Sequence, residues 1–322
     1  MMKMRIPISS RSVSDHVRAN FRTIDNPKMK LIELSLRDNY FTRFREGYLS
    51  TEWGRNDLQN HLCVRLDTDR HAIIPWLDEA RPLRDSSVLE IGCGTGCSTI
   101  ALAEQGAMVT AIDVDEHSLK VASDRCQAYG VDVSFAHANA MNVEELFSGQ
   151  RFNYVIFYAS LEHMTIAERM CAMKATWEML SDGDLWCVIE TPNRLWYFDA
   201  HTSLLPFNMW LPDELAFLYS RHSSRDNYRE LYRNYTTESH LHFLRRGRGV
   251  SFHEFELTLK PLSGLKIKSS LDMSPDKRRG ILNRLKHRFS DEVKYVSLLQ
   301  KLAPEVPKAF LQSYLNLIIE KD

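Results

Sequence analysis

Three glycines at alternate positions form the stretch of this chain that is best suited to hold a ligand against the main chain. Residues 88–91 have the pattern of a strand, Gly92, Gly94 and Gly96 follow directly, and a helical pattern comes next. Because glycine has no Cβ, such a loop can turn sharply and present its amide groups to a ligand. About twenty residues further on, a second strand pattern ends in the carboxylate of Asp113, an order typical of α/β sheets that bind a nucleoside-bearing cofactor.

The spacing of the glycines distinguishes between cofactors. A dinucleotide fingerprint has the pattern G-x-G-x-x-G, which would place its last glycine at position 97. Cys97 occupies that position here, and the last glycine comes one residue earlier. The resulting pattern, E-x-G-x-G-x-G, resembles the class I S-adenosylmethionine-dependent methyltransferases of the small-molecule type over residues 86–193. This resemblance implies S-adenosyl-L-methionine as the cofactor and S-adenosyl-L-homocysteine as the product.

The same resemblance implies a role for each residue of the motif. The glycine loop would hold the methionine end of the cofactor, and Glu90 would stand near its sulfonium and amino group. Asp113 would accept hydrogen bonds from the ribose hydroxyls. Val114 would press on one face of the adenine.

The adenine contact after the third strand departs from the family pattern. The family often has an acid there, whereas this chain has Asn139. An amide carbonyl can still accept a hydrogen bond, so Asn139 and the backbone of Ala140 are predicted to contact the adenine. The alternative is an ordinary loop asparagine.

The loop after the fourth strand carries the first candidates for catalysis. His163 titrates in the range that suits a general base, and Glu162 could orient it or hold the acceptor. His201 lies in a segment rich in aromatic residues and prolines, which is typical of a pocket wall. The alternative for both histidines is simple packing, and Glu162 could instead favour the start of a helix.

Substrate contacts are expected at the ends of the fourth and fifth strands, because sheets of this topology leave a crevice there. The candidates are Tyr158, Asn193 and Arg194. Arg194 could bind a carboxylate or phosphate of the substrate, or pair with a nearby acid. Tyr40, Tyr48 and Trp53 are weaker candidates for a lid over the cofactor.

Strand and helix patterns alternate through the middle of the chain, which predicts a parallel sheet with helices on both faces. With the resemblance, the expected fold is α/β: a doubly wound, Rossmann-like seven-stranded sheet. The expected strands are 87–91, 108–112, 131–136, 153–158, 184–190, 249–257 and 265–268, and the expected core helices are 97–105, 116–128 and 166–180.

Six segments are expected along the chain. They are a mobile N-terminal segment (1–26), an N-terminal helical region (27–85), the cofactor-binding core (86–193), a cap insertion (194–248), the last two strands (249–272) and a helical C-terminal tail (273–322). A structureless insertion of that length would be unusual, so helices are expected in the cap at 213–221 and 225–244.

The composition of the chain argues against nucleic-acid-binding, disulfide-rich and membrane proteins. The chain has 322 residues, 44% of them hydrophobic, and a formal net charge of −1, so no global field attracts nucleic acid or an anionic membrane. Its six cysteines contain no C-x-x-C pair, so we expect neither a metal site nor a disulfide framework. No stretch approaches the roughly 18 apolar residues of a membrane helix, and we expect a cytoplasmic protein without membrane partners.

We therefore expect methyl transfer to a small-molecule substrate, at oxygen. Residues 191–212 resemble bacterial methyltransferases of small-molecule or glycan biosynthesis, which implies a small acceptor. Transfer to nitrogen or carbon is the alternative on the same scaffold. A methyltransferase that uses the basic C-terminal third on RNA and a non-catalytic cofactor-binding partner protein are alternatives of other classes, and a homo-oligomer stays open.

Overall fold

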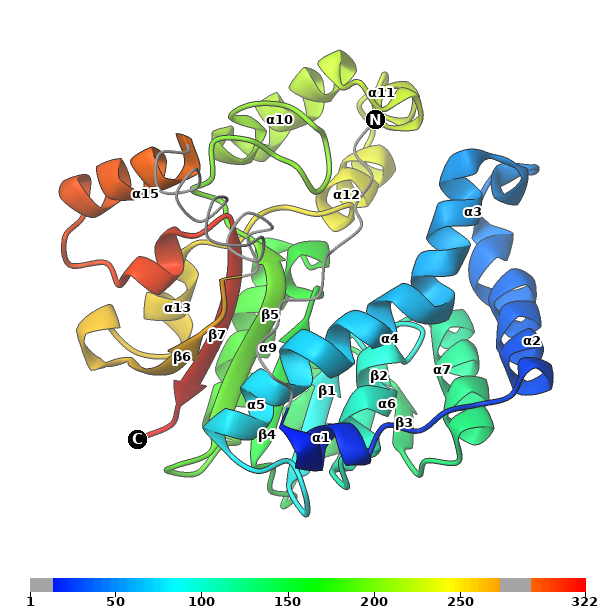
Figure 1. Cartoon of the computed structure of the whole chain (residues 1–322). Helices are drawn as coiled ribbons and strands as arrows, with labels where there is room; N and C mark the ends of the chain where they lie inside the picture. Colours follow the sequence, from blue (N-terminus) through cyan, green and yellow to red (C-terminus); the bar gives the residue numbers. More distant parts are fainter. Residues whose placement is uncertain (1–13, 273–290) are drawn as a thin grey trace. The chain divides into compact units, whose positions relative to one another are not determined.

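The computed structural model describes residues 14–272 and 291–322 (Figure 1). Within these ranges the chain forms two compact units. The first holds residues 14–142 and 147–156, and the second holds residues 143–146, 157–272 and 291–322.

Seven strands in the described residues form one sheet, in the order β3-β2-β1-β4-β5-β7-β6. They are β1 (Ser87–Ile91), β2 (Met108–Asp113), β3 (Ser134–His137), β4 (Tyr154–Tyr158), β5 (Leu185–Pro192), β6 (Lys266–Ser270) and β7 (Tyr314–Glu320). The expected α/β, Rossmann-like seven-stranded sheet is confirmed. The first five strands lie within a few residues of their predicted positions.

The strands of the first unit are parallel, with β1 paired to β2 and β2 to β3. Two helices connect them in the chain, α6 (Cys97–Ala103) between β1 and β2 and α7 (Glu116–Tyr129) between β2 and β3. α7 begins at Asp115, whose side chain accepts the N–H of His117, and it ends at Gly130, which is left-handed. Local capping therefore sets the length of the helix that follows the candidate ribose-binding strand.

The predicted N-terminal helical region is confirmed. It consists of α2 (Asn26–Ser35), η1 (Leu36–Tyr40), η2 (Phe41–Arg43), η3 (Tyr48–Ser50), α3 (Glu52–Gln59), η4 (Asn60–Val64), α4 (Arg65–Thr68), η5 (Asp69–Ile73) and α5 (Ile74–Ala80), and α1 (Asp15–Ala19) precedes it. α2 starts at Asp25, which accepts the N–H of Lys28, and it packs beside α7, where Ser35 donates to Asp124 at 2.6 Å. Of the N-terminal segment expected to be mobile, residues 1–13 lie outside the described residues; the rest includes α1, in which Val17 is buried.

The second unit packs helices on antiparallel strands. β7 pairs with both β5 and β6. Among the described residues, its helices outside the cap are α8 (Val143–Leu146), η7 (Leu161–His163), α9 (Ile166–Glu178), α13 (Phe252–Thr258), η10 (Leu262–Gly264), α15 (Asp291–Leu302) and η12 (Lys308–Leu311). Trp186 of β5 is fully buried against Phe157 and Phe255, and its indole N–H donates to Thr176 of α9 at 3.0 Å. This tryptophan joins three elements of the unit.

The cap insertion is helical, as predicted. It contains η8 (Asn208–Trp210), α10 (Asp213–Tyr219), η9 (Ser220–His222), α11 (Asp226–Leu231) and α12 (Thr237–Arg245). The single helix expected over 225–244 is two helices, because Thr236 starts a new one with a capping box. The cap has its own small core of buried residues: Ala216, Phe217, Tyr228, Tyr232 and Phe243.

Two predictions about the end of the chain are wrong. Residues 249–257 do not form a strand; most of them belong to α13, which Ser251 and Glu254 start with a reciprocal capping box. The C-terminal tail is not wholly helical, because it ends in β7, a strand that is almost entirely buried. Residues 273–290, the first part of that tail, lie outside the described residues. No helix in the described part of the chain is long and apolar enough to cross a membrane.

Candidate functional site

The backbone conformation of the glycine-rich loop between β1 and α6 favours glycine at three positions. Gly92, Gly94 and Gly96 all have positive φ angles, of 79°, 52° and 80°. A Cβ on Gly96 would lie 2.8 Å from the Cβ of Ala122 on α7, whereas a Cβ on Gly94 would meet nothing within 4 Å. Gly96 therefore permits close packing of α7, and Gly94 borders open space.

Asp113 is tied to this loop. Its Oδ2 accepts the N–H of Gly94 at 2.8 Å, and its Oδ1 accepts the N–H of Asp115 at 2.9 Å. Burial raises the pKa of Asp113, and these backbone hydrogen bonds lower it. Each carboxylate oxygen keeps a further lone pair that a ribose hydroxyl can use. Val114 next to it is 61% exposed, which leaves an apolar surface beside the carboxylate.

Glu90 is engaged within the protein. It is fully buried on β1 and accepts hydrogen bonds from the hydroxyls of Ser98 and Thr99 in the first turn of α6. Burial raises the pKa of Glu90, and the two hydroxyl donors lower it. This carboxyl group joins the strand and the helix on either side of the glycine loop.

The predicted adenine contacts lie directly after β3. Asn139 Oδ1 accepts the N–H of Met141 at 3.0 Å, and Ala140 is buried at the start of η6 (Ala140–Asn142). The amide nitrogen of Asn139 makes no hydrogen bond to the described residues, so a donor is available there as well as a partly used acceptor.

His61 was not predicted, although it lies against the glycine loop. Its Nδ1 is 3.1 Å from the hydroxyl of Thr95, and the ring of Tyr40 packs 4.4 Å from its own. The buried guanidinium of Arg125 donates to the carbonyls of Thr95, His61 and Leu62. Burial is the main cause that lowers the pKa of His61 well below 6.5, and nearby arginines add to it. No local motif marks this histidine, because its neighbours come from three separate segments.

The three lid candidates differ in their surroundings. Tyr40 is held between His61 and the guanidinium of Arg43, whereas Tyr48 stacks on Phe44. Trp53 is 80% exposed. Tyr40 therefore packs on His61, which contacts Thr95 of the glycine loop.

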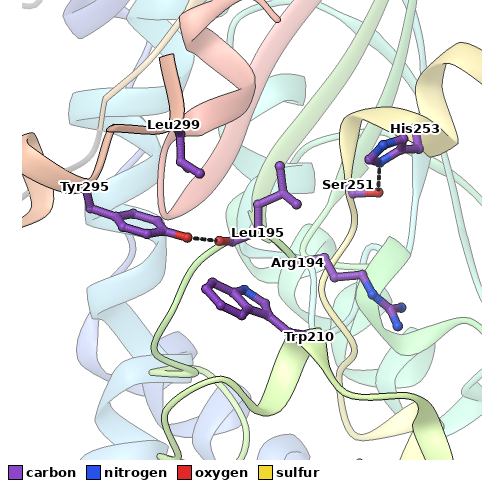
Figure 2. A pocket seen from close by; sticks show the side chains of 7 residues that line it. All are labelled: Arg194, Leu195, Trp210, Ser251, His253, Tyr295 and Leu299. Atoms are coloured by element: carbon purple, nitrogen blue, oxygen red, sulfur yellow. Dashed lines mark hydrogen bonds between the residues drawn. The ribbon is translucent and has the colours of Figure 1, made fainter. Parts of the chain in front are cut away.

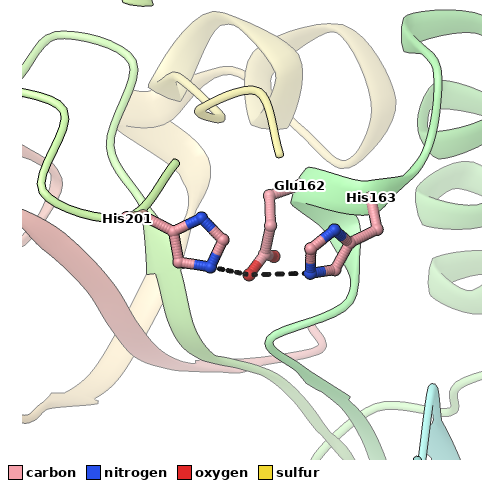
Figure 3. Close-up of side chains that lie close together, drawn as sticks. All are labelled: Glu162, His163 and His201. Atoms are coloured by element: carbon pink, nitrogen blue, oxygen red, sulfur yellow. Dashed lines mark ion pairs between the residues drawn. The ribbon is translucent and has the colours of Figure 1, made fainter. Parts of the chain in front are cut away.

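In the second unit, the three catalytic candidates come together (Figure 3). Glu162 and His163 lie in η7 (Leu161–His163) directly after β4, and His201 comes from the segment after β5. The carboxylate of Glu162 lies between the two imidazole rings, with its Oε1 4.0 Å from His163 Nε2 and 3.9 Å from His201 Nε2. We call these three residues the Glu-His-His cluster.

The surroundings of the cluster fix its geometry. Glu162 is fully buried, and burial raises its pKa while the neighbouring His163 lowers it. Its Oε2 accepts a long hydrogen bond from Thr191 at 3.4 Å, and its main-chain carbonyl accepts the N–H of Arg248 at 2.8 Å. The flanking backbone is strained, since Ala159 and Glu190 both have positive φ angles.

The predicted substrate residues have different roles in the structure. Tyr158 ends β4 and is half-buried. Asn193 is buried, and its amide donates to the carbonyls of Phe310 and Gln312 while its Oδ1 accepts the N–H of Leu195. All these partners belong to the protein, so Asn193 holds the loop in place.

Arg194 instead lines a cavity of about 360 Å³ in the second unit (Figure 2). Among the described residues its guanidinium has no hydrogen-bonded or ion-paired partner. The other lining residues are Leu195, Trp210, Ser251, His253, Tyr295 and Leu299. Tyr295 closes one side, because its hydroxyl donates to the carbonyl of Leu195 at 2.7 Å. Burial raises the pKa of the nearby Glu254, and the charges of Arg169 and Arg194 lower it.

Comparison with known proteins gives one family. A family model described as a methyltransferase domain matches residues 88–183. The chain is 34% identical over 110 residues to the ubiquinone biosynthesis O-methyltransferase of Pseudomonas entomophila (strain L48) and 34% identical over 136 residues to that of Rhizobium leguminosarum bv. trifolii (strain WSM2304). These alignments cover 34% and 41% of this chain, and 46% and 52% of the relatives. The chain thus spans about half the length of the curated relatives it matches.

Among solved structures, the chain is similar to magnesium protoporphyrin IX methyltransferase from Synechocystis PCC 6803 with bound SAM. The TM-score is 0.38 and the sequence identity 21%, over 53% of this chain and 79% of that one.

Proposed function

We propose that this protein transfers the methyl group of S-adenosyl-L-methionine to an oxygen of a small-molecule acceptor, because residues 88–183 match a family model described as a methyltransferase domain. The observation that carries the proposal is the hydrogen bond between Asp113 and the amide of Gly94. It joins the predicted methionine-binding loop to the predicted ribose-binding carboxylate. The choice of oxygen is supported by the relatives named ubiquinone biosynthesis O-methyltransferases.

For the cofactor, the glycine loop holds the methionine end and Asp113 accepts the ribose hydroxyls. The exposed side chain of Val114 offers an apolar surface for adenine, and Asn139 with the Ala140 backbone contacts its edge. Glu90 acts by fixing β1 to α6, so its negative charge stands behind the loop rather than free in solvent. S-adenosyl-L-homocysteine is then the product that stays bound to the same groups.

For the acceptor, the second unit provides the groups. Methyl transfer breaks the carbon–sulfur bond of the sulfonium and forms a carbon–oxygen bond, and the acceptor hydroxyl must lose its proton. We assign the handling of that proton to the Glu-His-His cluster. Arg194 binds an anionic group of the acceptor, since its side chain lines the cavity and makes no hydrogen bond or ion pair to the described residues, although its charge also acts on Glu254.

The remaining site residues support these roles. Tyr158 contacts the acceptor from the end of β4, and Asn193 positions the loop that carries Arg194. Holding the acceptor in line with the methyl group supplies much of the acceleration in such a reaction. From the composition of the sequence, we place the activity in the cytoplasm.

The test uses the full chain with methyl-labelled cofactor and an extract of native small metabolites. We expect label in one or a few small products, which mass spectrometry identifies, and an oxygen-bound methyl group in each. Label on nitrogen or carbon would correct the acceptor atom, and label on RNA alone would overturn the small-molecule assignment. A protein that binds S-adenosyl-L-homocysteine but labels nothing would overturn catalysis.

A further inference from the structure

The Glu-His-His cluster brings three electron-pair donors to one point. Its ligand atoms, Glu162 Oε1 and the Nε2 atoms of His163 and His201, all lie within 4.8 Å of one another. Figure 3 shows the carboxylate between the two rings, with each ring turning an Nε2 toward it. A group of this kind needs a positive charge at its centre, either a proton or a cation.

The proton positions on the rings follow from their other nitrogens. His163 Nδ1 lies 2.9 Å from the carbonyl of Arg245, which can only accept, so Nδ1 carries the hydrogen. His201 Nδ1 lies 2.8 Å from the hydroxyl of Thr202, and that hydroxyl has its own acceptor in the carbonyl of Gly247 at 3.1 Å. Nδ1 of His201 therefore also carries the hydrogen. In the neutral state both rings thus turn an Nε2 lone pair toward Glu162.

One oxygen of the central carboxylate lacks a hydrogen-bond donor. Glu162 is fully buried, and its Oε1 has no hydrogen-bond partner. The guanidinium of Arg169, which acts on it electrostatically, is held elsewhere by an ion pair with Glu254 at 2.8 Å. A buried carboxylate oxygen without a donor is costly unless a charge compensates it.

The distances suit a small divalent ion. Two ligands bound to a tetrahedral zinc at about 2.1 Å lie roughly 3.4 Å apart. The two nitrogens lie 3.9 and 4.0 Å from the carboxylate oxygen, and all three atoms lie within 4.8 Å of one another. Each oxygen–nitrogen distance must therefore shorten by about half an ångström, and the nitrogen–nitrogen distance by at most about 1.4 Å. The Nδ1 hydrogen bonds already orient both rings, as the outer partners of metal-binding histidines do.

We propose that Glu162, His163 and His201 bind one divalent transition-metal ion, with the remaining coordination positions open to water or to an oxygen ligand. Two imidazoles and one carboxylate favour zinc, iron, cobalt or manganese over the all-oxygen sites of magnesium or calcium. This proposal departs from the expectation of no metal site, which rested on cysteine spacing alone. It does not rest on the proposed methyl transfer.

Gly247 leaves the space that the outer hydrogen bond of His201 needs. A Cβ on Gly247, whose φ is 129°, would lie 2.6 Å from Thr202 Oγ1 and 2.9 Å from His201 Nδ1. Glycine at this position therefore lets the backbone lie close to Thr202 and His201, so that the carbonyl of Gly247 accepts from the Thr202 hydroxyl beside His201 Nδ1. With a metal bound, neither Nε2 would be available as a base, so the metal content also decides between two ways of handling the acceptor proton.

The experiment uses the full chain, freed of metal by a chelator and titrated with Co²⁺ and separately with Zn²⁺. We expect about one equivalent to bind, with a visible Co²⁺ spectrum of nitrogen and oxygen ligation. Glu162→Gln and His163→Ala should each weaken Co²⁺ binding by about 100-fold or more, and Thr202→Val, which removes only an outer partner, by about 10-fold. His222→Ala, which removes an exposed histidine of the cap, should leave the titration unchanged.

Two results would overturn the metal site. One is a wild-type chain that takes up no Co²⁺ or Zn²⁺, and the other is equal uptake by the wild type and the His163→Ala variant; since His163 has a side chain 45% exposed, this variant should fold. S-adenosyl-L-homocysteine binding is measured on the same samples. A chain that binds this product but no metal refutes only the metal site, and a chain that binds metal but not the product refutes only the cofactor site.

Discussion

The two candidate sites of this protein differ in how completely their polar groups are satisfied. In the cofactor loop, both oxygens of Asp113 accept backbone N–H groups, and both oxygens of Glu90 accept hydroxyls. In the Glu-His-His cluster, the central oxygen of Glu162 has no donor. The protein itself supplies hydrogen-bond donors to every carboxylate oxygen of the first site. The second site needs a proton or a metal ion at the unpartnered oxygen of Glu162.

This difference follows from how each site is built. The cofactor loop depends on backbone conformation within one strand-loop-helix unit, with a single carboxylate from the next strand. The cluster depends on side chains from two separate segments and on the carbonyl of Arg245 from a third. Substitutions should therefore change stability and cofactor binding in the first site, and reactivity in the second.

The largest effect is expected for His163→Ala. Turnover should fall by about 100-fold or more, because the variant loses a group that handles the acceptor proton. The affinity for S-adenosyl-L-homocysteine should stay unchanged, and His222→Ala serves as the matched control. Steady-state kinetics with calorimetry separates the two quantities. Near-wild-type turnover would mean that His163 has only a structural role and that the Glu-His-His cluster does not handle the acceptor proton.

The next effect concerns two of the three glycines of the loop. Gly96→Ala combines a positive φ with a clash against Ala122, and we expect it to lower the free energy of unfolding by about 2–4 kcal/mol. Gly94→Ala has the backbone cost alone, roughly 1 kcal/mol. Urea denaturation of the two variants measures the difference. Equal losses would mean that α7 does not pack against the loop as described.

A similar effect is expected for Asp113→Ala on cofactor affinity. Loss of a charged hydrogen-bond acceptor should weaken S-adenosyl-L-homocysteine by about 1.5–3 kcal/mol. The exposed Asp132→Ala removes the same charge elsewhere in the unit and should leave affinity as it is. Calorimetric titration gives both values. If a folded Asp113→Ala variant bound as tightly as the wild type, the ribose assignment would be refuted.

The smallest effect is a pH dependence from His61. Its pKa is lowered in the folded state, so below pH 6.5 the unfolded chain takes up a proton that the folded chain does not. The free energy of unfolding should therefore fall with decreasing pH below about 6.5, by up to about 1.4 kcal/mol per pH unit from this residue. His61→Gln should flatten that part of the profile. The interval between pH 5 and 7 includes the ordinary histidine pKa of about 6.5. If the His61→Gln profile ran parallel to the wild-type profile there, the predicted contribution of His61 would be wrong.

The parts that could be predicted from the sequence are those with local causes. The glycines and Asp113 lie in a short stretch whose order dictates a strand, a turn and a helix. The strand predicted at 249–257 failed because its apolar alternation outweighed a capping box at Ser251 and Glu254 that was present in the sequence. β7 was missed for a related reason: its apolar run, interrupted only by Asn316, is typical of a strand buried on both faces, and it fits a helix equally well.

Long-range features could not be predicted in the same way. His163, His201 and Glu162 were each chosen for their chemistry, but nothing in the sequence indicated that one carboxylate would lie between two rings. His61 was missed because its partners, Thr95 and Tyr40, lie far from it along the chain. Such arrangements depend on tertiary packing, which residue types and spacing do not encode locally.

The most direct test of the account is a calorimetric comparison of two ligands on the wild-type chain, S-adenosyl-L-homocysteine and a nicotinamide dinucleotide. A loop with the E-x-G-x-G-x-G spacing and Asp113 at its edge should bind the first with a stoichiometry of about one and give no heat with the second. Binding of the dinucleotide alone, or no binding of either ligand, would contradict the central claim that this loop holds an adenosyl sulfonium.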